Sequence, residues 1–280
     1  MLPDFLLIGA MKCGTSTLQA QLARQPGVFM TTPKEPNFFS DDDVHARGLD
    51  WYKALFAAAA PGDLKGEAST HYTKLPTHPQ ALPRMRAVLP APRLIYMIRN
   101  PVERAISHYI HAWSVGAAGH DPEQAFAAMP ELVDYGRYAM QIAPYLSAYG
   151  ADRVFLTSLE QITADPASEF ARIAAFLGLP EGAAWVPDLA PQNVSGERYQ
   201  PLPFHGLLVD SAPARILRRA LVPKALRARI RKARTLQDRP HIPTGQRAAL
   251  EATFLADRAA LAEAFAGHPA LDLCYPFAPR

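Results

Sequence analysis

The sequence has 280 residues, of which 49% are hydrophobic and 20% are charged, and its formal net charge at pH 7 is +3. A chain of this length supports one substantial core, and the small net charge argues against nucleic acid as a partner. Only two cysteines occur, without a CxxC pair or a Cys/His cluster, which argues against a disulfide framework and a zinc site.

The first residues carry no feature of an export signal. No basic stretch precedes the apolar run Phe5–Ile8, and this run is too short for the apolar core of a signal peptide. Nowhere does an apolar stretch approach the about 20 residues that span a bilayer. We therefore expect a cytoplasmic protein that does not cross a membrane.

Short apolar runs alternate with stretches of helical spacing along the chain. This alternation predicts an α/β fold, a single P-loop-like domain in which helices flank a central parallel sheet. Strands are expected at Phe5–Ile8, Asp63–Glu67, Arg93–Ile98 and Val154–Thr157. Helices are expected at Thr15–Arg24, Pro101–Trp113, Asp165–Leu177 and Gln246–Phe265. Prolines cluster in Pro76–Pro92 and Pro187–Pro203, which we interpret as loops.

The segment between the first strand and the first helix predicts a phosphate-binding loop. Gly9 and Gly14 permit a tight turn, and free N–H groups at a helix start attract a phosphate. The glycine spacing nearly satisfies the P-loop pattern GxxxxGK[ST], but Thr15 stands where the lysine belongs and the lysine is at position 12. An ATP-hydrolysing loop needs that lysine, and it needs a strand-end acid to help hold Mg²⁺. Here Arg99 follows the Arg93–Ile98 strand, which suits a second phosphate better than a cation.

Two segments together resemble the family of sulfotransferases that use 3′-phosphoadenosine 5′-phosphosulfate (PAPS). Gly9–Leu18 resembles the 5′-phosphosulfate loop of that family, and Leu94–Tyr109 resembles its 3′-phosphate motif. Thr32–Phe39 and Gly66–Tyr72 are similar to segments of the heparan-sulfate type and its soluble bacterial relatives. Asn193–Arg198 is similar to the late nucleotide-binding loop. We therefore expect a nucleotide-binding core with acceptor segments over residues 1–200 and a helical part over 201–280, within one domain.

The resemblance implies a role for each matching residue. The 5′-phosphate contacts would come from the loop, and Lys12 would also stabilise the charge that develops on the leaving phosphate. The guanidinium of Arg99 and the hydroxyl of Ser107 would bind the 3′-phosphate. The expected nucleotide-binding residues are Lys12, Cys13, Gly14, Thr15, Ser16, Thr17, Arg99, Ser107 and Arg198. Arg104 is interpreted as an ordinary helix-surface group, and Cys13, at a helix N-terminus beside Lys12, is expected to have a lowered thiol pKa.

Glu35 is the candidate general base, because an acceptor hydroxyl must lose its proton as it attacks sulfur. Lys34 stands next to it and would tune it. His71 and His108 are alternatives, since a neutral imidazole suits this role near pH 7. His71 lies in a segment expected to line the acceptor pocket, whereas His108 is interpreted as a packing residue.

The implied reaction is metal-independent, in-line transfer of a sulfuryl group from PAPS to a hydroxyl or amine of a small-molecule, glycan or lipid-like acceptor, which leaves 3′,5′-adenosine bisphosphate (PAP). Heparan-sulfate enzymes usually carry a lysine where Ala68 stands, which argues against a long anionic polysaccharide. The basic segment 214–234 is either a solvated face or a peripheral membrane contact. About half of six aromatic residues are expected to line an acceptor cleft: Phe38, Phe39, Trp51, Tyr52, Tyr72 and Trp113. A Mg²⁺-dependent kinase and a non-catalytic nucleotide-binding protein are the alternative functions.

Overall fold

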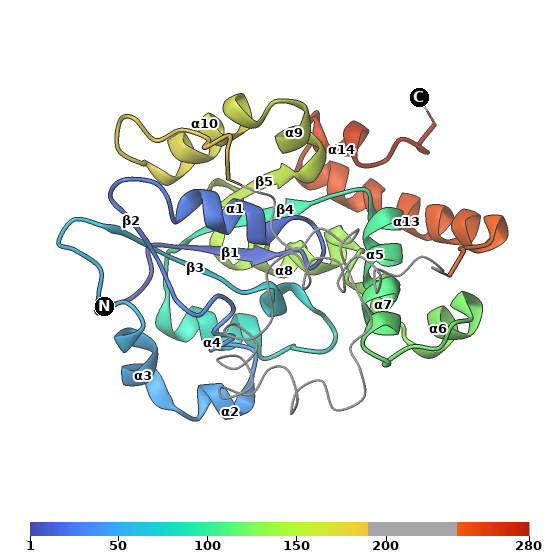
Figure 1. Ribbon diagram of the computed structural model, residues 1–280, viewed down its shortest axis with the longest axis horizontal. Helices are drawn as coiled ribbons and strands as arrows, with labels where there is room; N and C mark the ends of the chain where they lie inside the picture. The colour runs from blue at the N-terminus through green and yellow to red at the C-terminus, as the bar shows by residue number, and fades with distance from the viewer. Residues whose placement is uncertain (190–239, 280) are drawn as a thin grey trace, which may run out of the picture.

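The computed structural model describes residues 1–189 and 240–279, and in this part of the chain helices flank a five-stranded parallel sheet (Figure 1). The strand order is β2-β3-β1-β4-β5, and every neighbouring pair is parallel. The strands are β1 (Phe5–Gly9), β2 (Val28–Met30), β3 (Leu64–Ala68), β4 (Arg93–Ile98) and β5 (Val154–Ser158). The predicted α/β fold with a central parallel sheet is confirmed.

Most helices begin and end where local sequence signals place them. Asn100 caps α5 by accepting hydrogen bonds from the N–H groups of Val102 and Glu103, and Gly178 ends α10 in the left-handed conformation. The α-helices are α1 (Thr15–Leu22), α2 (Asp42–His45), α3 (Gly48–Ala54), α4 (Ala81–Val88), α5 (Pro101–Ser114), α6 (Pro122–Ala128), α7 (Glu131–Asp134), α8 (Tyr138–Tyr149), α9 (Leu159–Ala164), α10 (Pro166–Leu177), α13 (Thr244–Ala264) and α14 (Ala270–Leu273). Within residues 1–189 and 240–279 there are also two 3-10 turns, η1 (Thr70–Thr73) and η2 (Ala151–Arg153).

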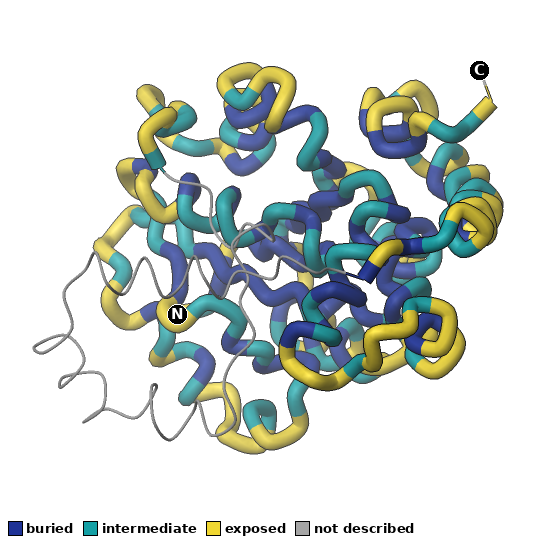
Figure 2. Tube along the Cα trace, turned by 45° about the vertical axis from the view of Figure 1, so that its right-hand side comes forward, coloured by how far each residue is buried: buried dark blue, intermediate teal, exposed yellow. Residues whose placement is uncertain are grey.

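The sheet forms the centre of the core. All five residues of β1 are buried, and so are five of the six residues of β4, because helices cover both faces of a parallel sheet. In Figure 2 the buried trace runs through the middle of the molecule, and the exposed positions lie on the surrounding helices and loops. None of the helices in the described ranges is long and apolar enough to cross a membrane.

The structure contains several elements that the sequence-based expectation lacks, among them α4 and β2. The proline-rich stretch Pro76–Pro92 contains helix α4, and Pro83 lies in the first turn of this helix, where a missing N–H costs no helical hydrogen bond. β2 was not predicted, because three residues are too few to show a periodic pattern. The Asn193–Arg198 motif and the basic segment 214–234 lie outside the described residues.

Two glutamine side chains join the far end of α1 to the segment around Trp185. The amide of Gln21 exchanges two hydrogen bonds with the backbone of Val186, at 2.8 and 2.9 Å. Gln25 exchanges two with Ala184, both at 3.0 Å. Each side-chain amide therefore satisfies one backbone N–H and one carbonyl, as a neighbouring strand would.

The sheet topology predicts where a ligand site belongs. β2 and β3 lie on one side of β1 in the sheet, and β4 and β5 lie on its other side. The direction in which successive strands are added therefore changes next to β1. In such sheets ligands bind at the carboxyl ends of the strands, beside this change of direction. The loops that follow β1, β3 and β4 meet there.

Candidate active site

The loop after β1 has the strand–turn–helix arrangement that its sequence predicts. The N–H of Ala10 bonds to the carbonyl of Met97 at 2.6 Å, and Lys12 has a left-handed backbone with φ of 70°. Gly14, with φ of 90°, is the N-cap of α1. A Cβ added at Gly14 would come within 3.0 to 3.1 Å of the side chains of Leu159 and Met97, and its positive φ strains other residues, so glycine is favoured on both grounds. The first turn of α1 therefore begins immediately after this glycine, and the positive end of the helix dipole faces the loop, which favours an anion there.

Arg99 lies at the carboxyl end of β4 and faces this loop. Its Nη1 donates a hydrogen bond to the carbonyl of Lys12 at 3.3 Å. The hydroxyl of Tyr138 holds the Arg99 backbone, since it donates to the Arg99 carbonyl at 2.9 Å. The Nε of Arg99 is buried and has no hydrogen-bond partner among the described residues. The guanidinium therefore retains a donor for an anion that binds beside the loop.

Ser107 and His108 lie two turns further along α5. Ser107 is partly exposed, and His108 is buried with its ring stacked on Tyr135 at 5.7 Å between centroids. Burial and the nearby charges of Arg104 and Lys74 lower the pKa of His108 to about 2. His108 is thus held neutral in a packed position, as its place on the helix indicated.

Lys34 joins the phosphate loop to the candidate base. Its ammonium donates to the Ser16 hydroxyl at 3.1 Å and to Oε1 of Glu35 at 2.9 Å. Thr70 donates to the same carboxylate oxygen at 3.2 Å. The N–H of Glu35 bonds to the carbonyl of Ala68 at 2.9 Å, so the loop after β2 is fastened to the end of β3. The Glu35 carboxylate is therefore held beside the phosphate loop, because the Lys34 ammonium contacts both.

The surroundings of Glu35 favour its ionised form. Burial alone would raise the pKa of its carboxyl, but the charge and hydrogen bond of Lys34, the Thr70 hydroxyl and the charge of Lys74 together hold that pKa below its usual value. Glu35 therefore carries a negative charge at neutral pH and can accept a proton. Its backbone is left-handed, with φ of 58°, which turns the side chain back toward Lys34.

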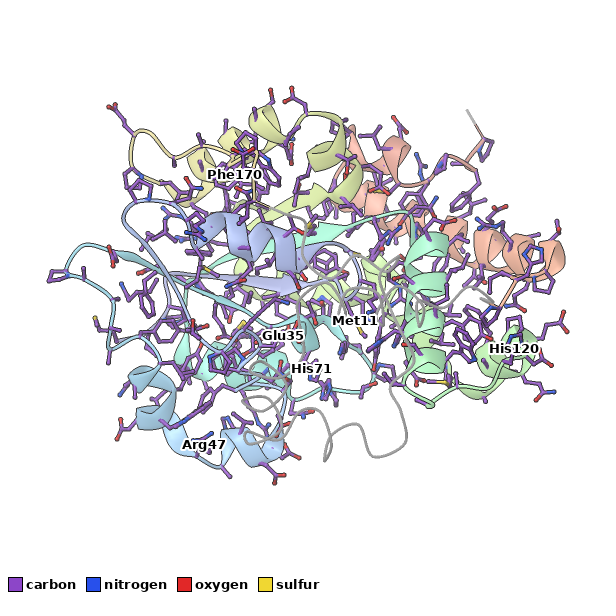
Figure 3. All side chains as sticks on the ribbon, in the orientation of Figure 1. Met11, Glu35, Arg47, His71, His120 and Phe170 are labelled. Atoms are coloured by element: carbon purple, nitrogen blue, oxygen red, sulfur yellow. The ribbon has the colours of Figure 1, made fainter. Side chains whose placement is uncertain are left out.

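His71 shares this region, as predicted. In Figure 3, His71 and Glu35 lie with Met11 of the phosphate loop in the central part of the view, whereas Arg47, Phe170 and His120 lie toward the edges. The His71 ring stacks on His78 at 4.8 Å between centroids. Burial, followed by the positive charge of Lys74, lowers the pKa of His71 to about 4. The imidazole is therefore neutral at pH 7, and it is only a weak base.

The expected lowering of the Cys13 thiol pKa is wrong. The side chain is fully buried and contacts the hydroxyl of Tyr138 at 3.5 Å. Burial raises the pKa of Cys13 to about 11, although Tyr138 and the charges of Arg99 and Arg104 oppose the rise. The thiol points into the core, so only the backbone of Cys13 can serve a ligand in the loop.

Arg104 is likewise not a helix-surface group. It has no exposed surface, and its Nη2 donates to the carbonyl of Leu132. Its Nε and Nη1 have no partner among the described residues, and burial lowers its pKa. Position 104 lies between Pro101 and His108 on the apolar face of α5, so helical periodicity could have identified it as buried.

A buried carboxyl group supports the end of β3. Glu67 is completely buried, and burial raises its pKa. It accepts hydrogen bonds from the hydroxyls of Tyr52, Ser69 at 2.7 Å and Tyr72 at 2.5 Å. Ser69 in turn accepts from the N–H of Asn37 at 3.2 Å, which connects this network to the loop that carries Glu35.

Most of the six aromatic residues proposed for an acceptor cleft belong to the core. Four are almost completely buried, and Trp51 and Trp113 pack against the core from its edge. Phe38 stacks on Tyr52 at 4.4 Å between centroids. The core packs these rings tightly, so an acceptor can contact at most the two tryptophans. The four buried rings are Phe38, Phe39, Tyr52 and Tyr72.

Comparisons with known proteins show the family to which the chain belongs. The family model for the sulfotransferase domain matches residues 2–195, and the chain belongs to this family. Human heparan sulfate glucosamine 3-O-sulfotransferase 6 is 32% identical over 186 residues, which cover 63% of this chain and 52% of that protein. Bovine bifunctional heparan sulfate N-deacetylase/N-sulfotransferase 2 is 27% identical over 199 residues, 64% of this chain and 22% of that protein. The chain thus spans about half or less of the length of these curated relatives.

Solved structures match a larger share of the chain. The crystal structure of a sulfotransferase from Alicyclobacillus acidocaldarius has a TM-score of 0.63 and 23% identity, and the match covers 94% of this chain and 95% of that one. The sulfotransferase domain from the curacin biosynthetic pathway has a TM-score of 0.51 and 15% identity, with coverage of 91% and 98%. These matches show that the chain has the fold of those proteins.

Proposed function

We propose that the protein transfers a sulfuryl group from PAPS to a hydroxyl or amine of a small-molecule, glycan or lipid-like acceptor, in line and without a metal ion. The observation that carries the proposal is the bridge made by Lys34. This lysine holds the Glu35 carboxylate at 2.9 Å and Ser16 of the phosphate loop at 3.1 Å, so a proton acceptor stands beside the expected position of the donor phosphate.

The residues around the loop suit a nucleotide that carries two separate phosphates. The N-terminus of α1 and the ammonium of Lys12 would hold the 5′-phosphate, because α1 begins directly after Gly14. Arg99 has a buried guanidinium nitrogen without a partner in the described ranges, and with Ser107 it would bind the 3′-phosphate. Arg198 stays a prediction, since it lies outside the described residues. PAPS, when bound, supplies an activated sulfuryl group and a stable leaving group.

Each residue has one task in the transfer. Glu35 accepts the proton of the acceptor hydroxyl or amine while the new bond to sulfur forms. The bond from sulfur to the 5′-phosphate oxygen breaks, and the leaving oxygen keeps the electron pair. Lys12 stabilises the negative charge that develops there, because a fixed cation needs no reorganisation during the reaction. Lys34 keeps Glu35 ionised and in place through its short contact.

The relatives support oxygen or nitrogen as the nucleophile in the acceptor. Their names describe 3-O- and N-sulfotransferases that act on heparan sulfate. Ala68 lies at the end of β3, where its carbonyl accepts a hydrogen bond from the Glu35 N–H. Its side chain is uncharged, so this position offers no positive charge to an anionic polysaccharide. We therefore propose a smaller acceptor than heparan sulfate.

Calorimetric titration with PAP and with ATP, each with and without Mg²⁺, tests the nucleotide site. We expect tight binding of PAP that does not depend on Mg²⁺, and little binding of ATP. A screen with radiolabelled PAPS against phenols, amines, glycosides and hydroxylated lipids then identifies the acceptor. A preference for Mg²⁺-ATP would instead indicate the alternative kinase function.

A further inference from the structure

Lys74 is a buried cation that the proposed reaction has not yet used. The residue is only 8% exposed and directly follows η1. Within residues 1–189 and 240–279, its ammonium forms no hydrogen bond or ion pair, and its closest aromatic contact is the Tyr135 ring, 5.7 Å from the centroid. A lysine side chain that is largely buried, with no acceptor for its ammonium among the described residues, calls for an anionic ligand or a functional reason.

The backbone around Lys74 is fixed from three sides. The Thr73 hydroxyl donates to the Ile8 carbonyl in β1 at 2.8 Å. Tyr145 of α8 donates to the Tyr72 carbonyl at 2.5 Å, and Gln141 exchanges two hydrogen bonds with the backbone of Leu75, at 2.7 and 2.9 Å. Both neighbours of Lys74 are therefore anchored, and its backbone position is set by the same strand that carries the phosphate loop.

Thr73 also fixes the distance to that loop. A Cβ added at Gly9 would lie 1.9 Å from Oγ1 of Thr73, so η1 packs directly on the start of the loop. The positive charges of Lys74 and Lys12 both lower the pKa of His108. The charge of Lys74 also lowers the pKa of Glu35, and the charge of Lys34 lowers the pKa of Lys74. Thr70 at the start of η1 donates to the Glu35 carboxylate at 3.2 Å, so Lys74 directly follows a turn that spans the space between the phosphate loop and the candidate base.

This space is strongly electropositive. Glu35 is the carboxylate with the largest effect on the pKa of Lys74, and the effect opposes the burial that lowers that pKa to about 8. The other charged groups nearby repel the ammonium, as expected where an anionic ligand is missing. The titratable groups that face Lys74 are Lys34 and Glu35 of the loop after β2, His71 of η1, His78 of the loop before α4, Arg104 and His108 of α5, and Tyr135 beyond α7.

We propose that Lys74 is a further catalytic residue, whose ammonium binds the non-bridging oxygens of the sulfuryl group on its path from the donor phosphate to the acceptor. The proposal rests on the sulfuryl transfer proposed above. Lys74 stays protonated throughout: the acceptor proton goes to Glu35, and the leaving phosphate oxygen retains the electrons of the broken bond. Lys12 serves the leaving oxygen, whereas Lys74 serves the group that moves.

The comparison of two nucleotides isolates this contact, because PAP lacks the sulfuryl group that PAPS carries. We would titrate wild type and Lys74→Met with each nucleotide, without acceptor, at pH 7. Methionine keeps an unbranched apolar chain and removes the charge, so the buried position is retained. We expect Lys74→Met to weaken PAPS binding roughly ten- to hundredfold, as for a lost charge-assisted hydrogen bond, and to change PAP binding less than about twofold.

Lys74→Arg tests the charge independently of packing. As pH rises from 7 to 9, wild type should lose its extra affinity for PAPS over PAP, because free Lys74 deprotonates near pH 8. Lys74→Arg should keep that preference at pH 9, since arginine stays charged. A lysine that only supports the fold would show neither difference.

The outcomes separate the two proposals. If wild type binds neither nucleotide, sulfuryl transfer from PAPS is wrong, and the role of Lys74 falls with it. If wild type binds both nucleotides, two results for Lys74→Met would overturn the sulfuryl contact alone. One is an equal loss of affinity for PAPS and PAP, and the other is no loss for either. Thermal unfolding of each variant confirms that the compared proteins are folded.

Discussion

The guanidinium of Arg99 donates a hydrogen bond to the backbone carbonyl of Lys12 at 3.3 Å. Residues from the ends of β4 and β1 are thereby held together, although 87 positions separate them in the sequence. Arg99 is thus held beside the phosphate loop before any ligand binds, which preorganises the positive charge for a ligand with two anionic groups. The contact uses Nη1 and leaves the buried Nε of Arg99 for the phosphate that we propose it binds.

Replacing Arg99 should weaken nucleotide binding. Arg99→Lys keeps the charge but loses the planar fork, and we expect PAP affinity to fall by about 1.5–3 kcal/mol, or roughly ten- to hundredfold. Calorimetry measures the change. Arg93→Lys is the matched control: it lies at the other end of β4 and bonds to the Leu177 carbonyl at 2.8 Å. Equal losses in both variants would contradict a specific phosphate contact for Arg99.

Replacing Glu35 should separate binding from turnover. Glu35→Gln preserves shape but removes the proton acceptor, so we expect the rate of sulfuryl transfer to fall roughly 10²–10⁴-fold while PAP binding persists. Because its folded-state pKa lies below the usual value, wild-type activity should stay on its plateau as pH falls to about 5. Glu103→Gln serves as control, since Glu103 pairs with Arg247 at 2.9 Å at the surface. Full turnover by Glu35→Gln would transfer the base role to His71 or to water.

Cys13 should resist alkylation in the native protein. Burial and a pKa near 11 leave little accessible thiolate at pH 7.5. We expect iodoacetamide, followed by peptide mass spectrometry, to label Cys13 only after the chain is unfolded in urea. Cys274 is an internal control, because it is also buried and burial raises its pKa. Rapid native labelling of Cys13 alone would show that the thiol does not point into the core.

The buried Glu67 network should contribute strongly to stability. Glu67→Ala leaves three hydroxyls without their acceptor and creates a cavity, so we expect the free energy of unfolding to fall by roughly 2–4 kcal/mol. Tyr72→Phe removes one of the three donors and should cost about 1 kcal/mol. Urea unfolding followed by circular dichroism measures both. A loss in Tyr72→Phe as large as that in Glu67→Ala would contradict a shared network.

The same residue gives the stability a defined pH dependence. Burial raises the pKa of Glu67 in the folded chain above its unfolded value, so folding takes up a proton. Its contribution to stability is complete below the unfolded pKa of about 4.3 and is lost as pH rises through the folded pKa. The uncharged variant Glu67→Gln should therefore gain stability relative to wild type as pH increases from 4 to 7. A constant difference over this range would show that Glu67 titrates normally.

Four of the five strands of the sheet, and the loops at their carboxyl ends, could be predicted from the sequence. β1 and β4 are buried on both faces, and strands in that position of a parallel sheet have the short, continuous apolar runs from which they were predicted. Cys13 shows where local reasoning ends. A helix N-terminus does favour a thiolate, but Tyr138, 125 positions away, encloses the thiol and burial dominates. Lys74 illustrates the same limit, because tertiary packing buries its side chain, whereas the helical spacing of Arg104 from Pro101 and His108 could have indicated burial.

The glutamine pairing at the end of α1 makes the protein a candidate for intrinsic optical detection of ligands. Trp185 stands between Ala184 and Val186, whose backbones are held by Gln25 and Gln21, and its ring lies 6.2 Å from that of Phe170. The proposed phosphate site lies at the other end of α1, and this helix is only eight residues long. A displacement of that helix would alter the surroundings of the indole, so in a variant that lacks Trp51 and Trp113 we expect the emission of Trp185 to respond to nucleotide binding.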